Sequence, residues 1–237
     1  MLKMLARPAG LLLTCVYLLL AGCASPKTQV DAATDAENAQ ATLERFVRDP
    51  QMTWLQQNLP RAKAVLVSPS IWQAGFIVGA SGGTATVMAR SQGPHRWVGP
   101  AFYKLGTGSI GLQAGAQNVE MVILVMNDKA FNSLLSNSFK LGADVSIAVG
   151  PVGAGTGAPI VADMVIYTRS RGLYGGINLS GMVVTVDSTG NASYYGQPAS
   201  PVDILVRQTV TSPRAAALEQ RMVGLEAEAA NSVANRR

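Results

Sequence analysis

The stretch that decides the fold runs from residue 62 to residue 105 and reads AKAVLVSPSIWQAGFIVGASGGTATVMARSQGPHRWVGPAFYKL. Short runs of β-branched, aliphatic and aromatic residues alternate in it with Gly, Ser and Pro, which is typical of strands joined by turns. The same pattern continues to residue 127, so we expect strands at 65–67, 76–78, 84–88, 97–105 and 119–126. Strands this closely spaced predict a mostly antiparallel sheet.

Helical periodicity flanks this region on both sides. Apolar residues at helical spacing predict one helix over 35–47 and a short second helix that begins at Asp49-Pro50 and ends at Pro60. Asp128 is expected to cap a helix that reaches Phe139, followed by strands at 145–149, 164–168, 176–179 and 182–186. This succession predicts an α+β fold.

A final amphipathic helix is expected over 212–235, beginning at Ser212-Pro213. Its polar side carries Glu219, Glu226 and Glu228, which an anionic membrane would repel. We therefore expect it to dock on the body of the protein or on the N-terminal helices.

The first 23 residues have the pattern of a bacterial lipoprotein signal. Lys3 and Arg7 precede an apolar run of about a dozen residues, which is too short to span a bilayer, and Leu20-Ala21-Gly22-Cys23 forms a lipobox. We expect residues 1–22 to be a signal peptide, Cys23 to carry acyl chains such as palmitate, and 23–34 to be a flexible tether. No Asp follows Cys23 directly, and likeness to other lipoproteins then implies the periplasmic face of the outer membrane. The alternative is an ordinary secretory signal in which Cys23 is incidental.

Composition excludes several classes of function. Charged residues make up 14% of the 237 residues and the net charge is only +5, which is too mild to imply a nucleic-acid partner. His95 is the single histidine, and both cysteines lie within the first 23 residues, so neither a Cys/His metal site nor a disulfide framework is expected.

No catalytic or nucleotide-binding motif is complete. Gly79-Ala80-Ser81-Gly82-Gly83 has the letters of a nucleophile elbow, but a strand pattern follows it and no acid lies between Ser81 and His95, so we expect a turn there. The glycine-dense segment 150–157 lacks the Lys and the helix of a phosphate loop. An enzyme built on Ser81 stays the weakest hypothesis, and we expect no enzyme, cofactor or metal.

Basic residues beside aromatic rings are the remaining candidates for a binding surface. The pairing suits lipid headgroups and the membrane interface, and it is equally common on ordinary solvated surfaces. Arg169 and Arg171 share one side of a strand, which makes them the better candidates for contact with an anion. The candidate headgroup contacts are Lys63, Arg90, Arg96, Trp97, Tyr103, Lys104, Arg169 and Arg171.

Several blocks of sequence, in one order, resemble the SYLF-domain family. They lie at 62–69, 74–79, 97–102, 108–115, 141–153, 167–181 and 194–196, and the likeness covers about residues 40–207. The resemblance implies a SYLF-like domain over 35–207, with its core at about 62–207, and a non-catalytic role in phospholipid binding. Eukaryotic members are associated with phosphoinositides, and the yeast-type branch with actin.

Departures from the family pattern narrow this expectation. Pro60 breaks the segment that eukaryotic members use as an amphipathic lipid-binding helix, Ser68 replaces the aromatic often found before Pro69, and Thr84-Ala85 interrupts a glycine-rich run. Actin and phosphoinositides are not expected in a periplasm, so the expected ligand is anionic bacterial phospholipid. The alternative is a structural or interaction module of the envelope, attached only by acylated Cys23, that offers its Gly-rich edges and C-terminal helix to a protein partner.

Overall fold

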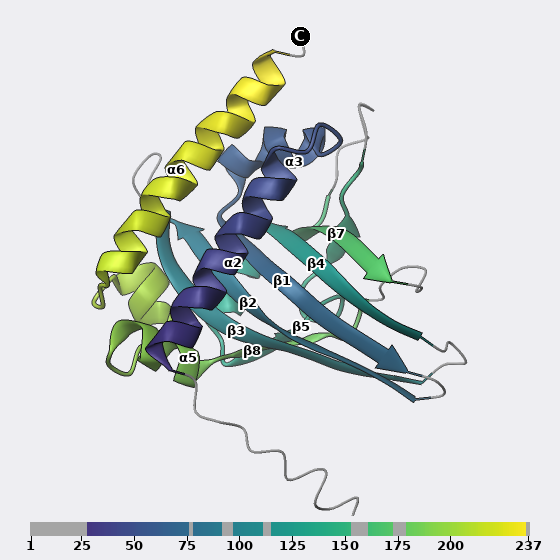
Figure 1. The fold of residues 1–237 in the computed structure, drawn as a ribbon, viewed down its shortest axis with the longest axis horizontal. Helices are drawn as coiled ribbons and strands as arrows, with labels where there is room; N and C mark the ends of the chain where they lie inside the picture. The colour runs from purple at the N-terminus through teal and green to yellow at the C-terminus, as the bar shows by residue number, and fades with distance from the viewer. Residues whose placement is uncertain are drawn as a thin grey trace, which may run out of the picture.

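The computed structural model describes residues 28–75, 78–91, 97–110, 115–152, 161–172 and 179–235. They form one eight-stranded sheet in the order β5-β8-β3-β2-β1-β4-β7-β6, with helices α2 and α6 lying across one face (Figure 1). Every neighbouring pair is antiparallel except β6 and β7. The predicted α+β class with a mostly antiparallel sheet is confirmed.

The four central strands are much longer than most of the outer ones. Between Val67 and Ile71 a bulge in β1 shifts its register with both neighbours. The strands are β1 (Ala64–Gly75), β2 (Val78–Arg90), β3 (Trp97–Ile110), β4 (Gly115–Val125), β5 (Ser138–Lys140), β6 (Ile147–Val149), β7 (Met164–Gly172) and β8 (Val183–Val186).

Helix α2 (Gln29–Val47) begins earlier than the sequence pattern predicted. The side chain of Thr28 accepts a hydrogen bond from the backbone of Asp31 at 3.2 Å, and Asp31 accepts one from the backbone of Thr28 at 2.9 Å. This capping box starts the helix six residues before the predicted position 35, and Ala32 and Ala33 are already buried. The tether expected over 23–34 is therefore wrong for residues 29–34.

The other helical segments are short, apart from the C-terminal one. They are α3 (Thr53–Asn58), η1 (Leu59–Arg61), α4 (Asp128–Leu134), α5 (Ser188–Tyr195), the π-helical turn η2 (Asp203–Arg207) and α6 (Pro213–Ala234). Among the described residues, no helix combines the length and apolar character needed to cross a membrane.

Both faces of the sheet are buried over its upper part. Val65 and Leu124 contact the helices α2 and α6, whereas Leu66 and Ile123 face a second core that includes Tyr103. Leu218, Met222, Leu225 and Ala229 of α6 are buried against α2 and the sheet. Docking of the C-terminal helix on the body is thus confirmed, and each fully buried Leu or Met contributes about 1.5–3 kcal/mol.

Three local expectations differ from the structure. Helix α4 ends at Leu134 and is capped by Asn127, whose side chain accepts a hydrogen bond from Ala130 at 3.0 Å, and Phe139 belongs to β5. Helix α5 was not predicted, because its sequence STGNASYY has no apolar period. The 79–83 segment, expected to be a turn, continues strand β2.

The four central strands β1 to β4 extend further than the strands β7 and β8 that flank them. Strand β8 pairs with β3 only at residues 103–106, and β7 pairs with β4 no further than residue 117. The remaining parts, residues 72–75, 78–82, 106–110 and 115–118, form a projection that neither α2 nor α6 covers (Figure 1). We call these four segments the distal blade.

Candidate functional site

The predicted basic residues fall into two groups at different places on the sheet. Lys63 and Arg90 lie where β1 begins and β2 ends, and the backbone N–H of Arg90 donates to the carbonyl of Lys63 at 2.7 Å. Lys104 of β3 pairs with Thr84, and Arg169 of β7 pairs with Glu120, so these two lie much nearer the distal blade. The structure therefore does not assemble the predicted set into one patch.

Arg90 and Trp97 form an internal contact with helix α6 rather than a surface. Trp97 is fully buried, and its indole N–H donates to Oε2 of Glu226 at 3.1 Å. The Arg90 guanidinium lies 4.5 Å from the centre of the Trp97 ring and contacts both oxygens of Glu226 at 3.2 Å. It also donates to the carbonyls of Ala62 and Leu59. The predicted interfacial position of Trp97 is wrong, because its ring fills the space between β3 and α6.

Tyr103 is also buried. Its hydroxyl donates to the carbonyl of Leu134 at 2.7 Å, and burial raises the pKa of this hydroxyl well above its usual value. The predicted interfacial role of Tyr103 is wrong as well, because its side chain faces the second core, on the side of the sheet away from α2 and α6.

Lys104 faces outward beside Tyr103. Its ammonium lies 3.2 Å from Oδ1 of Asp187, a carboxylate that is 1% exposed and that also accepts the backbone N–H of Gly190 to cap α5. The Lys104 side chain itself is 61% exposed. An ammonium has three donors, so Lys104 can keep its ion pair and still donate to an anion from solvent.

Arg169 stacks on helix α2. Its guanidinium lies 4.7 Å from the centre of the Phe46 ring and forms an ion pair with Asp49. Nearby, Arg45 pairs with Glu120 at 2.8 Å. These groups belong to the rim of an open hollow of about 500 Å³ that is lined by Ala41, Glu44, Arg45, Arg48, Asp49 and Arg169. The hollow contains both basic and acidic side chains, and these already form ion pairs.

Two of the candidates give no side-chain geometry. Arg96 lies outside the described residues, as does Cys23. The backbone of Arg171 pairs with Asn118 at the root of the distal blade, and its side chain is not described.

Lys63 forms an ion pair at 2.7 Å with Asp128, which is 77% exposed, and such an exposed pair contributes little to stability.

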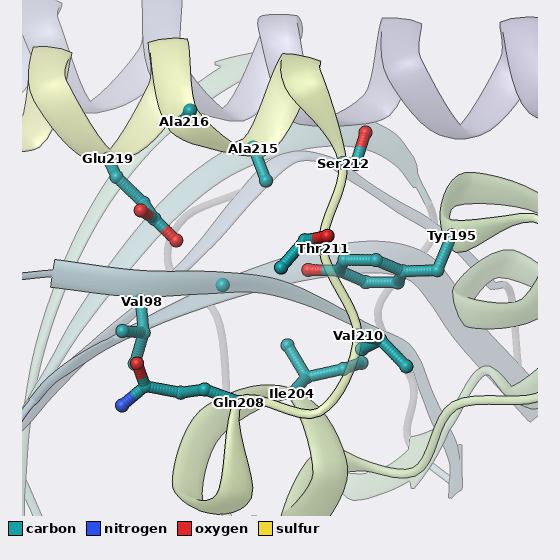
Figure 2. Close-up of a pocket in the computed structure, with 11 residues that line it drawn as sticks. Val98, Tyr195, Ile204, Gln208, Val210, Thr211, Ser212, Ala215, Ala216 and Glu219 are labelled. Carbon is teal, nitrogen blue, oxygen red and sulfur yellow. The ribbon is translucent and has the colours of Figure 1, made fainter.

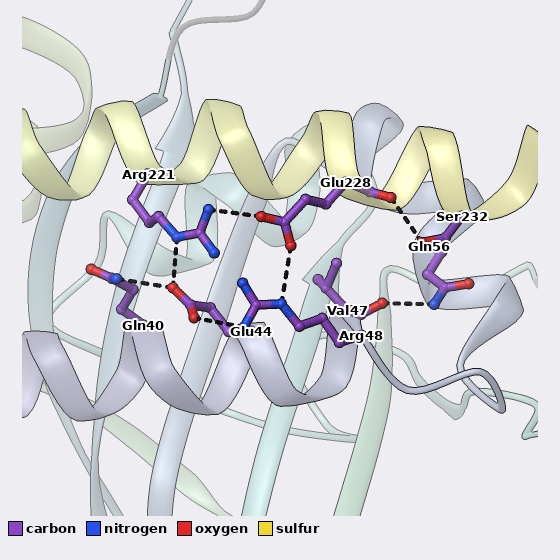
Figure 3. Close-up of polar contacts among 8 residues, drawn as sticks. All are labelled: Gln40, Glu44, Val47, Arg48, Gln56, Arg221, Glu228 and Ser232. Atoms are coloured by element: carbon purple, nitrogen blue, oxygen red, sulfur yellow. Dashed lines mark hydrogen bonds and ion pairs between the residues drawn. The ribbon is translucent and has the colours of Figure 1, made fainter.

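An ionic network holds α6 against α2 (Figure 3). Arg221 donates to Glu44 at 2.6 Å and to Glu228 at 2.9 Å, and Arg48 reaches both carboxylates from the α2 side. The hydrogen bond from Arg221 lowers the pKa of Glu44, and those from Arg221 and Arg48 lower the pKa of Glu228. These charges bind one helix to the other, so they are structural.

A partly enclosed pocket lies beside the start of β3. Tyr195 and Glu219 point into it from α5 and α6, and Val98, Ile204 and Val210 form much of its wall (Figure 2). The Tyr195 hydroxyl donates to the carbonyl of Pro100 at 2.9 Å. With a volume of about 150 Å³ this pocket is smaller than the 300–1,000 Å³ typical of small-molecule sites.

The described residues contain no assembled catalytic or metal-binding group. Ser81 lies inside strand β2, and its hydroxyl is buried without a hydrogen bond to any described residue. His95, its only conceivable base, lies outside the described part of the chain. Within that part no three His, Cys, Asp or Glu side chains come together as metal ligands.

The most important side chains that the sequence did not reveal are buried acids and amides. Glu226 was expected on the polar side of the C-terminal helix, yet it is buried, and so is Asp187. Asn191 is fully buried and accepts the backbone N–H of Phe102 at 2.8 Å. The partners cited here are 83 to 136 residues away in the sequence, and no local pattern marks such pairs.

Comparison with known proteins gives one family and several longer relatives. Residues 106–223, from β3 to α6, match the family Ysc84, described as "Las17-binding protein actin regulator". The SH3 domain-containing YSC84-like protein 1 of Xenopus laevis is 31% identical over 133 residues, which cover 54% of this chain and 39% of the relative. The SH3 domain-containing protein PJ696.02 of Schizosaccharomyces pombe is 29% identical over 196 residues, 77% of this chain and 45% of the relative.

Protein YSC84 of Saccharomyces cerevisiae is 24% identical over 196 residues, which cover 77% of this chain and 41% of the relative. The chain thus spans less than half the length of each of these three relatives. No solved structure matches it.

Proposed function

Because the chain belongs to the SYLF-domain family, we propose that it is a non-catalytic phospholipid-binding protein, held at the periplasmic face of a bacterial outer membrane by acylated Cys23. Proteins of this family are known for lipid binding and, in the yeast-type branch, for actin binding. The observation that carries the proposal is the match of residues 106–223, which spans β3 through α6 and therefore much of the folded domain. Likeness to regulatory relatives also argues against an enzyme.

We propose headgroup contacts only for the basic residues that lie near the distal blade. Lys104 of β3 keeps free donors in solvent, and Arg169 and the backbone of Arg171 lie on β7, across the same part of the sheet. Arg90 is committed to Glu226, and Trp97 and Tyr103 are buried. Anionic phospholipid is the ligand we propose for these cations, because a phosphate accepts several charge-assisted hydrogen bonds.

The alternative function, a structural or interaction module of the envelope, has less support than lipid binding. It would present the C-terminal helix to a partner, but the apolar side of α6 is buried against α2 and the sheet. Lipid contact is therefore the better-supported function, and a protein partner would have to bind elsewhere.

Vesicle co-sedimentation of the unacylated chain from residue 24 onward tests the proposal. We expect tighter binding to vesicles of phosphatidylethanolamine and phosphatidylglycerol than to phosphatidylcholine vesicles, and weaker binding as salt is raised. Lys104→Gln should weaken binding to the anionic vesicles about fivefold, since one basic residue near such a surface contributes about 1 kcal/mol.

The matched control is Lys129→Gln. Lys129 is 64% exposed and also pairs with one acid, Asp163 at 2.9 Å, but it lies beyond the other end of β4. Binding of this variant should equal that of the unchanged chain, and thermal unfolding of both variants checks that each is folded. Equal binding to both kinds of vesicle, or no binding at all, would defeat the proposal.

A further inference from the structure

We propose that the distal blade is the part of the molecule that enters the bilayer, with its helix-side face lying in the interfacial zone of the membrane. This inference rests on the proposed function. It assigns lipid contact to a surface formed by Trp72 and by Ala and Gly residues, none of which is among the predicted basic and aromatic contacts.

The blade is formed by two long uncharged stretches of the sequence, one of which is the longest in the chain. No Asp, Glu, Lys or Arg occurs from residue 64 to residue 89 or from residue 105 to residue 119, although charged residues make up 14% of the whole chain. A charged side chain at an exposed strand position favours contact with water. A surface that enters a membrane lacks such side chains, because moving a charge out of water is costly. The two residues that join β1 to β2 in the sequence are Phe76 and Ile77, which continue the apolar character.

The two faces of the blade differ in chemistry. Register aligns Trp72 with Gly82 and Asn118, and Ala74 with Ala80 and Ala116, all on the side of the sheet that α2 and α6 cover further up. Trp72 is 64% exposed, and Ala74, Ala80, Gly108 and Ala116 are exposed. The other face carries uncharged polar groups, namely Gln73, Ser81, Thr107 and Gln117.

A bilayer suits this surface better than a protein partner does. The helix-side face is flat, since Ala and Gly offer no deep pockets or knobs for shape-specific contact, and one exposed indole stands on it. Trp concentrates at the boundary between headgroups and acyl chains, where its ring is apolar and its N–H meets water or phosphate.

The strand edges set how deep the blade can go. Beyond residue 106 the outer edge of β3 has no partner strand among the described residues, and the same holds for β4 before residue 117. Unpaired backbone groups are excluded from the hydrocarbon core, so the blade enters only the interfacial layer. Gly75 lies three residues beyond Trp72, about 10 Å along the strand, which is a depth that this layer can accept.

Charges at the root of the blade orient it. Lys104 and Arg169 flank the sheet just above the uncharged segments, at a level where phosphate groups would lie if the blade were inserted. The N-terminal end of α2 lies on the same lower side of the molecule as the blade tip (Figure 1). Cys23 precedes Gln29 by six residues, which reach at most about 20 Å, so an acylated Cys23 and the blade can meet one membrane.

Quenching of tryptophan fluorescence by brominated lipid tests the inference. The probe is a vesicle of phosphatidylethanolamine and phosphatidylglycerol whose acyl chains carry bromine, added to the unacylated chain from residue 24 onward. We expect quenching of the unchanged chain and loss of most of that quenching in Trp72→Phe. The other two tryptophans are Trp97, which is fully buried, and Trp54, which is partly buried beside Tyr167 and lies outside the blade, so lipid should reach neither.

A pair of charge substitutions tests the same surface without the fluorophore. Ala80→Glu places a charge on the exposed face of the blade and should weaken vesicle binding about tenfold, which corresponds to about 1.4 kcal/mol. Val149→Glu places the same charge at an 82% exposed apolar residue of β6, outside the blade, and should leave binding unchanged. Circular dichroism and thermal unfolding check that both variants fold. If Ala80→Glu does not fold, the loss of quenching in Trp72→Phe still tests the inference.

The outcomes separate the inference from the proposed function. If the chain binds vesicles but Trp72 is not quenched and Ala80→Glu binds as tightly as the unchanged chain, the blade inference is overturned and the proposed function stands. If no form of the chain binds, both fail. If light scattering shows that the chain self-associates without lipid and Ala80→Glu abolishes this, the blade pairs with a second copy, and the inference is likewise overturned.

Discussion

Removal of Glu226 should loosen helix α6 more than any other single change to its charged residues. The carboxylate is 9% exposed, accepts both guanidinium nitrogens of Arg90 at 3.2 Å, and accepts the indole N–H of Trp97 at 3.1 Å. Glu226→Ala leaves a mostly buried guanidinium and a buried indole N–H without their acceptor.

The magnitude follows from what each variant leaves unpaired. Breaking a buried ion pair costs about 3–5 kcal/mol, but Arg90 is 19% exposed and keeps its bonds to the carbonyls of Ala62 and Leu59. We therefore expect Glu226→Ala to lower the free energy of unfolding by about 3 kcal/mol, which lowers Tm by about 6–12 °C in a domain of this size. Glu226→Gln keeps an acceptor for Trp97 and should cost about 2 kcal/mol.

Urea unfolding followed by circular dichroism and tryptophan emission measures both values, with Glu37→Gln as an exposed control on α2. Arg90→Met in the Glu226→Ala background should recover part of the loss, because it removes the unpaired charge. A loss below about 0.5 kcal/mol for Glu226→Ala, the range of an ordinary surface substitution, would refute the claim that this contact fastens α6 to the sheet.

Two further predictions concern packing and pH. Gly150→Ala should lower stability by about 1–3 kcal/mol, because the added Cβ would overlap the ring of Tyr167, and differential scanning calorimetry should show the lower Tm. Arg221→Met should destabilise the protein at pH 7 and progressively less as the pH falls below about 4.5, because Glu44 and Glu228 have lowered pKa values in the folded state and lose their charge there. Thermal unfolding from pH 7 to pH 3 checks this, and a constant difference between the two proteins would contradict the assigned role of the network.

The sequence predicted those helices and strands that are marked by a regular pattern of neighbouring residues. Alternation of β-branched residues with Gly and Pro located parts of each of the four central strands, although it divided residues 64–90 into three short strands instead of two long ones. The four- and three-residue spacing from Leu218 to Ala229 placed α6 on the body. Helix α5 escaped prediction because its stability comes from the buried cap Asp187 and from contacts of Asn191 with β3, which are distant in sequence.

The binding surface was only partly predictable for the same reason. A cation beside a ring in the sequence marks either a membrane interface or a buried cation–π contact, and Arg90 with Trp97 is of the second kind, because Glu226 of α6 lies across from both. Sequence alone showed that residues 64–89 carry no charge, but only the register shows that Trp72, Ala74 and Ala80 share one uncovered face.

The measurement that tests the central claim most directly is amide hydrogen exchange of the unacylated chain with and without phosphatidylethanolamine and phosphatidylglycerol vesicles. Contact of the domain itself with lipid predicts slower exchange at 72–75, 78–82, 106–110 and 115–118, and unchanged exchange in the buried helix α6. Identical exchange throughout the chain in both conditions would contradict the claim that this domain, and not only an acyl chain, binds the membrane.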